Sequence, residues 1–129
     1  MREGINIRAA HFPGRAPIDA YGDGGFRFAE MSHRGSIMCL PSGVHGWSVT
    51  EPSQINEETL SRVIGEAAEI NILLVGTGID LVPLPRPLRE QFRALGISVD
   101  SMSTGAAVRT YNVLLAEDRA VAAVLLAVE

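Results

Sequence analysis

The chain has 129 residues, 47% of them hydrophobic and 20% charged, and it carries a formal net charge of −4 at pH 7. This size and composition are typical of one globular domain, so we expect residues 1–129 to form a single domain around one core. The acidic balance argues against a nucleic-acid-binding protein, because such proteins usually present a basic surface to phosphates.

The first part of the chain is rich in glycine and predicts short antiparallel strands. Residues 22–25 read Gly-Asp-Gly-Gly, a strong turn signal between β-like segments at 18–21 and 26–29, and this pattern indicates a hairpin. Two more strands are predicted at residues 36–40 and 44–49. Connections this short join antiparallel neighbours.

The second part of the chain alternates strand and helix patterns. Asn56 is a suitable N-cap for a first helix, and Pro87 suits the first position of a second helix that Gly96 ends. That second helix has an apolar stripe of Leu88, Phe92 and Leu95. A third helix is predicted at 104–117, and strands at 70–75, 97–102 and 120–128.

The order strand, helix, strand, helix, strand favours parallel strands joined by right-handed crossovers. The run 120–128 is apolar on both faces, so we expect it to be a central strand. The sequence therefore predicts a mixed α/β (α+β) domain. Its C-terminal half is a parallel βαβαβ unit, and its N-terminal strands are antiparallel.

A candidate ligand site follows from two loops that leave these parallel strands. Residues 76–78 read Gly-Thr-Gly, and a helix begins at Thr104. Carboxyl ends of parallel strands share one edge, where a crevice forms, and a helix start offers unpaired N–H groups. Arg109 adds a cation one turn later, so a small anion such as a phosphate or carboxylate fits. The candidate residues are Gly76, Thr77, Gly78, Thr104, Gly105, Ala106, Arg109, Thr110, Tyr111 and Asn112, and we expect Thr77, Thr104, Arg109 and Asn112 to line a pocket.

The same residues also have a structural interpretation. Thr104 can cap its helix, and the small residues after it can let the helix pack closely on the sheet. Arg109 and Asn112 share one helix face and can bond a neighbouring segment, with Asp100 as a possible ion-pair partner of Arg109. Tyr111 is more often a core aromatic than a catalyst.

Other reactive residues give weaker signals. His11, His33 and His45 show no metal-ligand spacing, so we assign no metal, cofactor or catalytic residue. A thiol enzyme using Cys39 with His33 is kept as an alternative. Cys39 is the one cysteine, so no internal disulfide can form, which fits a reducing compartment. The start of the chain has no apolar signal core, and its longest apolar run is too short to span a bilayer. We therefore expect a cytoplasmic protein without a transmembrane segment.

Three motifs in the second part of the chain carry a family resemblance. Residues 73–78 (Leu-Leu-Val-Gly-Thr-Gly), residues 104–107 (Thr-Gly-Ala-Ala) and residues 109–114 (Arg-Thr-Tyr-Asn-Val-Leu) occur in order, with Gly96 and Met102 between them. The chain resembles a small-domain family that includes the mitochondrial complex I assembly factor three. The family also includes the adipogenesis-associated Mth-type domain protein of animals and bacterial and archaeal proteins of unknown function. The resemblance implies a single-domain, three-layer β/β/α fold with a mixed sheet and no established enzyme activity.

Two functional hypotheses follow. The first is a non-catalytic assembly or protein-interaction factor, whose partners, by resemblance, are respiratory complex subunits. It predicts an exposed apolar patch near Trp47 or near the proline-rich connector at residues 83–87. The second is a protein or enzyme that binds a small anionic ligand in the cleft described above.

Overall fold

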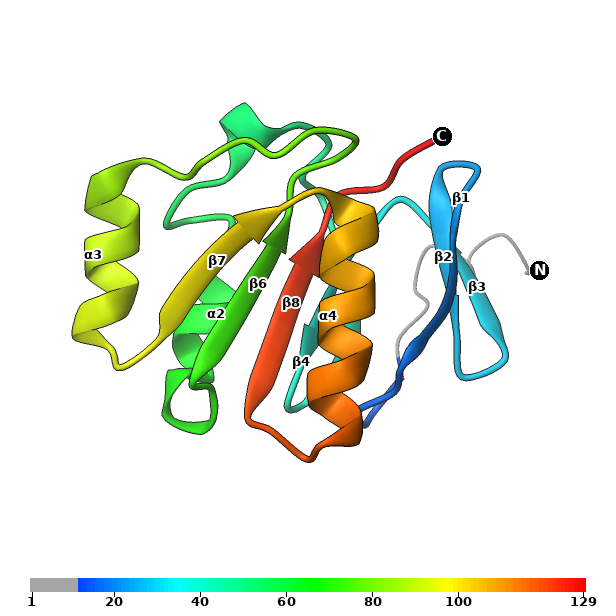
Figure 1. Cartoon of the computed structure of the whole chain (residues 1–129), viewed down its shortest axis with the longest axis horizontal. Helices are drawn as coiled ribbons and strands as arrows, with labels where there is room; N and C mark the ends of the chain where they lie inside the picture. Colours follow the sequence, from blue (N-terminus) through cyan, green and yellow to red (C-terminus); the bar gives the residue numbers. More distant parts are fainter. Residues whose placement is uncertain (1–11) are drawn as a thin grey trace.

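The computed structural model describes residues 12–129, so the start of the chain and His11 lie outside the described residues. Figure 1 labels the elements along the chain. The strands are β1 (Ile18–Gly22), β2 (Gly25–Phe28), β3 (Met31–Arg34), β4 (Ser36–Leu40), β5 (Gly43–Trp47), β6 (Ile72–Gly76), β7 (Ser98–Met102) and β8 (Val121–Leu125). The helices are α2 (Ser61–Gly65), α3 (Arg86–Ala94) and α4 (Thr104–Ala116), with short 3-10 turns η1 (Pro52–Gln54) and η2 (Ala67–Glu69).

The strands form two sheets. The larger has five strands in the order β5-β4-β8-β6-β7, and the smaller has three in the order β1-β2-β3. β8 and β7 both pair parallel with β6, whereas β4 pairs antiparallel with β5 and β8. The predicted mixed sheet and the central position of the last strand are therefore confirmed. β8 is buried over its whole length because it has neighbours on both edges and covering elements on both faces.

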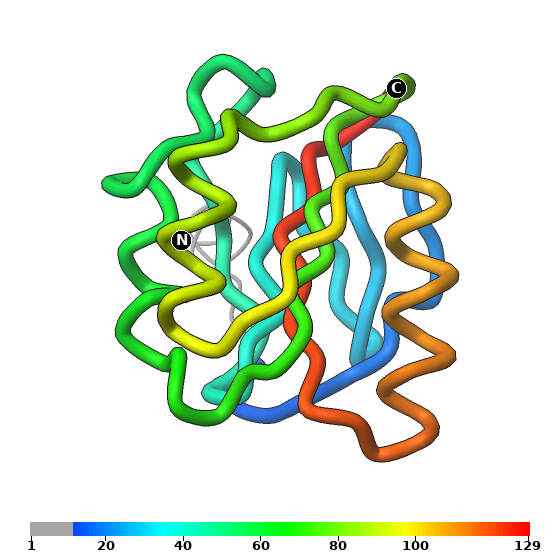
Figure 2. Tube along the Cα trace, turned by 60° about the vertical axis from the view of Figure 1, so that its left-hand side comes forward, coloured from blue at the N-terminus to red at the C-terminus, as the bar shows by residue number. Residues whose placement is uncertain are grey.

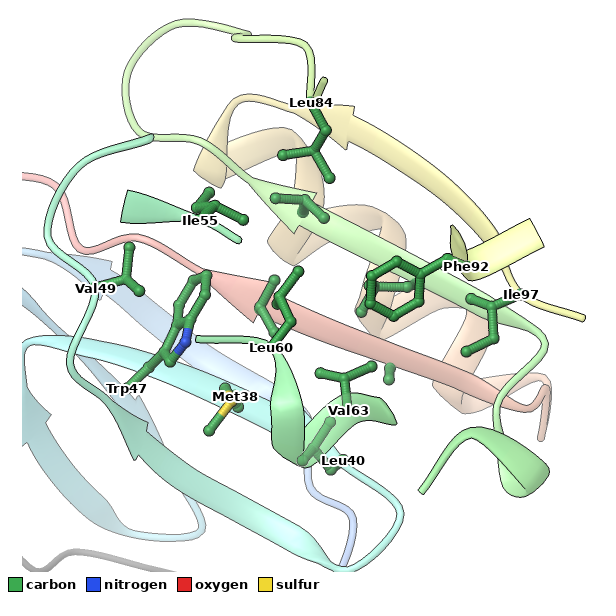
Figure 3. Packing of buried hydrophobic residues seen from close by; sticks show 14 of the residues in the cluster. Met38, Leu40, Trp47, Val49, Ile55, Leu60, Val63, Leu84, Phe92 and Ile97 are labelled. Atoms are coloured by element: carbon green, nitrogen blue, oxygen red, sulfur yellow. The ribbon is translucent and has the colours of Figure 1, made fainter. Parts of the chain in front are cut away.

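One face of the five-stranded sheet is covered by α2, α3 and the segments that lead into them. Strand alternation sends Met38 and Leu40 of β4 to this face, where they pack with Leu60, Val63 and Phe92. Figure 3 shows the Trp47 ring within this cluster. Its indole N–H donates to the Thr59 carbonyl at 2.8 Å, so the ring is both buried and hydrogen-bonded.

The opposite face is covered by α4 and by the three-stranded sheet. Ile37 and Cys39, the other half of the β4 alternation, lie in this second cluster with Phe28, Val108 and Tyr111. Figure 2 shows the small sheet and α4 on the same side of the large sheet. The large sheet is thus sandwiched between an α layer and a mixed layer of β-strands and α4, in agreement with the predicted fold class.

Strand β3 was not expected, and the reason lies in its turn. Phe28 pairs with Met31, so Ala29 and Glu30 alone connect β2 to β3. Both residues have positive φ, 49° and 62°, which is the backbone that a tight two-residue hairpin needs. Glycine or asparagine usually supplies this conformation, and their absence here hides the hairpin from the sequence.

The helical boundaries also differ in detail. Asn56 accepts a hydrogen bond from the Thr59 N–H at 2.9 Å, as an N-cap does, but only a turn follows and α2 begins at Ser61. Leu88 and Phe92 are buried as expected, whereas Leu95 is exposed. Gly96 has a φ of 84°, which ends α3 in the left-handed region as predicted.

Candidate functional site

Two loops meet at one edge of the five-stranded sheet. β6 and β7 are parallel and in register, with Gly76 opposite Met102, so the loops after them leave the sheet at the same edge (Figure 1). The Thr77 N–H donates to the Met102 carbonyl at 2.9 Å, and the Thr104 N–H donates to the Gly78 carbonyl at 2.8 Å. The loops therefore meet as the sequence predicts, and backbone hydrogen bonds join them directly.

The Thr104 side chain ties this edge together. Its hydroxyl donates to the Leu126 carbonyl at 2.8 Å and accepts from the Gly78 N–H at 3.0 Å. Thr104 is fully buried, with an exposed fraction of 0%. One hydroxyl thus connects the start of α4, the loop after β6 and the segment after β8. The cap of α4 comes instead from the Ser103 hydroxyl, which accepts from the Ala106 N–H at 3.4 Å.

The Thr77 side chain organises the loop that follows β6. Its hydroxyl lies 2.6 Å from the Asp80 carbonyl, to which it donates, and accepts from the Val82 N–H at 2.9 Å. Thr77 is buried beneath this loop. The hydroxyl therefore acts as an internal support that fixes the backbone from residue 77 to residue 82.

Neighbouring protein atoms leave no room for a side chain at two glycines of these loops. A Cβ on Gly76 would lie 3.0 Å from the Thr104 Cα and 3.0 Å from Leu125 Cδ2. A Cβ on Gly105 would overlap the hydroxyl of Tyr21, which rests on the first turn of α4. Close packing of α4 on β6 and β1 accounts for both glycines without a ligand.

A hollow opens beside these loops. Its volume is about 240 Å³, and Tyr21, Ile79, Ser103, Arg109 and Val128 are among its lining residues. Within residues 12–129, no hydrogen bond or ion pair engages the Arg109 guanidinium, and the expected pair with Asp100 does not form. Arg109 is therefore a cation at the rim of the hollow that the described part of the chain leaves available.

The remaining candidate residues lie elsewhere on α4. The Asn112 amide faces β1, where its oxygen accepts from the Ile18 N–H and its nitrogen donates to the Ile18 carbonyl, both at 2.9 Å. Thr110 is half-buried. Of the four side chains expected to line a pocket, Arg109 lines this hollow, whereas Thr77, Thr104 and Asn112 hydrogen-bond to the framework around it. Tyr21, Ile79 and Val128 were not singled out by sequence reasoning, although Ile79 directly follows the candidate residue Gly78 in the sequence.

Tyr111 and Cys39 form a buried pair between α4 and β4. Burial raises the pKa of the Cys39 thiol from its ordinary 9.0 to about 12, although a hydrogen bond from the Tyr111 hydroxyl opposes this shift. Burial also raises the pKa of Tyr111, as does the neighbouring Cys39. A thiol with so high a pKa is protonated at neutral pH and is a poor nucleophile. This environment gives no support to a thiol enzyme that uses Cys39.

The buried pair leads to an expected loss of stability in alkaline solution. In the unfolded chain Cys39 and Tyr111 lose their protons near pH 9.0 and 10.0, whereas the folded chain retains these protons to higher pH. The unfolded state then binds fewer protons, so the free energy of unfolding falls as the pH rises from about 9 toward 12. Urea unfolding on both sides of about pH 9 measures the change, and Cys39→Ala should reduce it. A midpoint independent of pH in this range would contradict the burial of the pair.

An exposed apolar surface lies in the loop between β6 and α3. Trp47 is buried, so the alternative that placed a patch there is wrong. The loop instead displays Ile79, Leu81 and Val82, with exposed fractions of 79%, 58% and 37%. These residues directly precede the proline-rich connector, the other place where the sequence predicts a patch.

Two further properties bear on function. Residues 12–129 contain no group of three or more His, Cys, Asp or Glu side chains arranged to hold a metal ion. In the same part of the chain, no helix has both the length and the apolar character needed to cross a bilayer.

Similarity to known proteins agrees with this fold. Residues 18–126 match a family described as "Protein of unknown function (DUF498/DUF598)". An uncharacterised protein of Rhodobacter capsulatus is 38% identical over 119 residues, which is 92% of this chain and 90% of the relative. The mouse NADH dehydrogenase (ubiquinone) 1 alpha subcomplex assembly factor 3 is 31% identical over 126 residues, which is 98% of this chain and 68% of the relative.

Solved structures extend the comparison. A crystal structure from Bartonella henselae, described as an outer membrane protein, is 64% identical, with a TM-score of 0.88 over 92% of this chain and 99% of that one. A Mth938-like domain of Bordetella pertussis is 30% identical, with a TM-score of 0.77 over 87% of this chain and 85% of that one. The chain therefore belongs to the DUF498/DUF598 family of unknown function, and it is related to NADH dehydrogenase assembly factors and to Mth938-like domain proteins.

Proposed function

We propose that this chain is a non-catalytic assembly factor that acts, as a single domain, through contacts with other proteins during the biogenesis of a respiratory complex. The observation that carries the proposal is the similarity to the mouse assembly factor, which extends over 98% of this chain. The rigid loop with its exposed Ile79 and Leu81 supports it, because apolar side chains held in water are typical of protein-binding surfaces. We place this activity in the cytoplasm, which suits a single free cysteine.

A deletion strain tests the proposed function. We expect cells that lack the gene to contain less fully assembled NADH dehydrogenase on native gels, with subcomplexes in its place. The wild-type gene should restore the complex, and so should a control variant with Val113→Ser, an exposed apolar position on α4 outside the loop. Normal amounts of the assembled respiratory complexes in the deletion strain would rule out this function.

A second function is favoured by the hollow beside Arg109, which could take a small phosphate or carboxylate. A ligand that binds the folded state raises its apparent stability, by about 2.7 kcal/mol at a hundred times the dissociation constant. Thermal-shift screening with inorganic phosphate, nucleotides and small carboxylates is the test. An increase in melting temperature that is lost in Arg109→Ala would support this function. Arg62→Ala is the control, which should retain the increase because Arg62 lies on α2 instead of α4. No shift with any of these compounds would exclude it for the compounds tested.

A further inference from the structure

We propose that the loop of residues 79–82 and Arg109 together form a docking surface for a partner polypeptide that presents a carboxylate next to an aliphatic side chain. This inference rests on the proposed function, because it names the surface and the kind of segment through which an assembly factor would act. The exposure of the loop, its rigidity and the charge beside it all support this surface.

The exposure of the loop is unusual for its composition. Ile79 and Leu81 place most of their surface in water, and Val82 is also exposed. An aliphatic side chain of this size that stays in water forgoes the favourable free energy that burial would provide. Three such side chains lie within four residues, so the free energy falls when another chain covers this surface.

The loop is also held in place, so its exposure does not result from slack in the chain. The Thr77 hydroxyl bonds the Asp80 carbonyl and the Val82 N–H, and Gly78 is bonded at both its N–H and its carbonyl to Thr104. Beyond the loop, Leu84 is buried in the core. A surface already fixed in its binding conformation loses little conformational entropy on association.

The charge beside the loop determines the chemistry of the partner. Ile79 lines the same hollow as Arg109, so an apolar contact and a guanidinium are offered side by side. Asp80 is in the same loop, but within residues 12–129 no ion pair joins its carboxylate to Arg109. A guanidinium presents paired N–H donors that match a carboxylate, and this match is the basis of the predicted acidic residue in the partner.

A protein partner accounts for these features better than a membrane does. The chain carries a net charge of −4, which opposes association with an anionic lipid surface. A small anion would use Arg109 but would leave Ile79 and Leu81 uncovered. A peptide segment covers the apolar side chains and neutralises the cation in the same contact.

To test this surface, peptides that bind the purified chain are selected from a library of random short peptides. Fluorescence anisotropy then measures the affinity of each selected peptide. We expect the selected peptides to share an aspartate or glutamate within a few residues of Leu, Ile or Val. Ile79→Ser and Arg109→Ala should each weaken binding by about tenfold. The matched controls Leu95→Ser and Arg62→Ala should leave the affinity unchanged, because both positions are exposed but lie outside the surface.

A double-mutant cycle makes the charge contact specific. Changing the peptide carboxylate to its amide should also cost about tenfold with the wild-type chain, and should cost nothing further with Arg109→Ala. Selection of basic peptides, of peptides indifferent to Ile79→Ser, or of none at all would overturn the proposal. Two other results would also overturn it, because each shows that the loop binds something other than a peptide. One is sedimentation of the chain with phosphatidylglycerol vesicles, and the other is a dimer that Ile79→Ser dissociates. A deletion strain deficient in assembled complex, together with failed peptide binding, would retain the proposed function and reject this surface.

Discussion

A valine in place of Thr104 should lower the free energy of unfolding by about 3 kcal/mol. Valine has the same shape as threonine but lacks the hydroxyl that bonds the Leu126 carbonyl and the Gly78 N–H. The bond to the Leu126 carbonyl is buried, so water does not replace the lost partner there, whereas the bond from the Gly78 N–H is only partly buried. Each buried polar group left without a hydrogen bond costs about 1–3 kcal/mol.

Urea unfolding measures this loss as a lower midpoint at an unchanged slope. Thr104→Ser retains the hydroxyl and should retain most of the stability, whereas Thr110→Val, a half-buried control on the same helix, should change little. Equal midpoints for Thr104→Val and the wild type would show that the hydroxyl does not hold these three segments together. The serine variant also separates stability from binding, because it preserves the framework beneath the 79–82 loop.

Asn112→Leu should cost about 2–3 kcal/mol, because two hydrogen bonds to the Ile18 backbone disappear together. The Asn112 amide contacts β1 much as a neighbouring strand would, with one donor and one acceptor. This contact attaches the three-stranded sheet to α4. We therefore expect that, in Asn112→Leu, the amides of the small sheet lose their protection from hydrogen exchange before those of the large sheet do.

The Asn112→Asp variant gives this prediction a pH signature. At neutral pH its carboxylate still accepts from the Ile18 N–H, but it also faces the Ile18 carbonyl, which repels it. Protonation at acidic pH restores a donor toward that carbonyl. The stability of the variant relative to the wild type should thus recover as the pH falls through the pKa of the new carboxyl group. Asn71→Asp, at an exposed position, is the control that should show no such recovery.

The fold was largely predictable because its signals are local. The glycine-rich turn at residues 22–25 predicts the β1–β2 hairpin, and the continuous apolar run at residues 120–128 predicts a central strand buried on both faces, which is β8. The crossover pattern predicts that β6 and β7 end at one edge, which brings the candidate loops together. The hairpin turn at Ala29 and Glu30 escaped prediction because neither residue prefers the positive φ that it adopts.

The candidate site shows what sequence reasoning could not determine. The sequence predicted that the loops carrying Thr77 and Thr104 meet at one edge of the sheet, but it could not say which groups each side chain would bond. Thr104 and Asn112 find their partners 22 and 94 residues away in the chain. Contacts between residues so far apart in the chain form only when the sheets and α4 pack together.

By itself, then, the sequence determined the order and type of the main elements and the edge at which two loops meet, because periodicity and turn chemistry act over a few residues. The tertiary structure alone decided that Thr77 and Thr104 are held by the framework and that Tyr21 covers Gly105. It also decided that no hydrogen bond or ion pair in residues 12–129 engages the Arg109 guanidinium beside an exposed Ile79. The physical reason is that a polar side chain bonds whatever group the packing brings within about 3 Å. Which group that is depends on the whole fold.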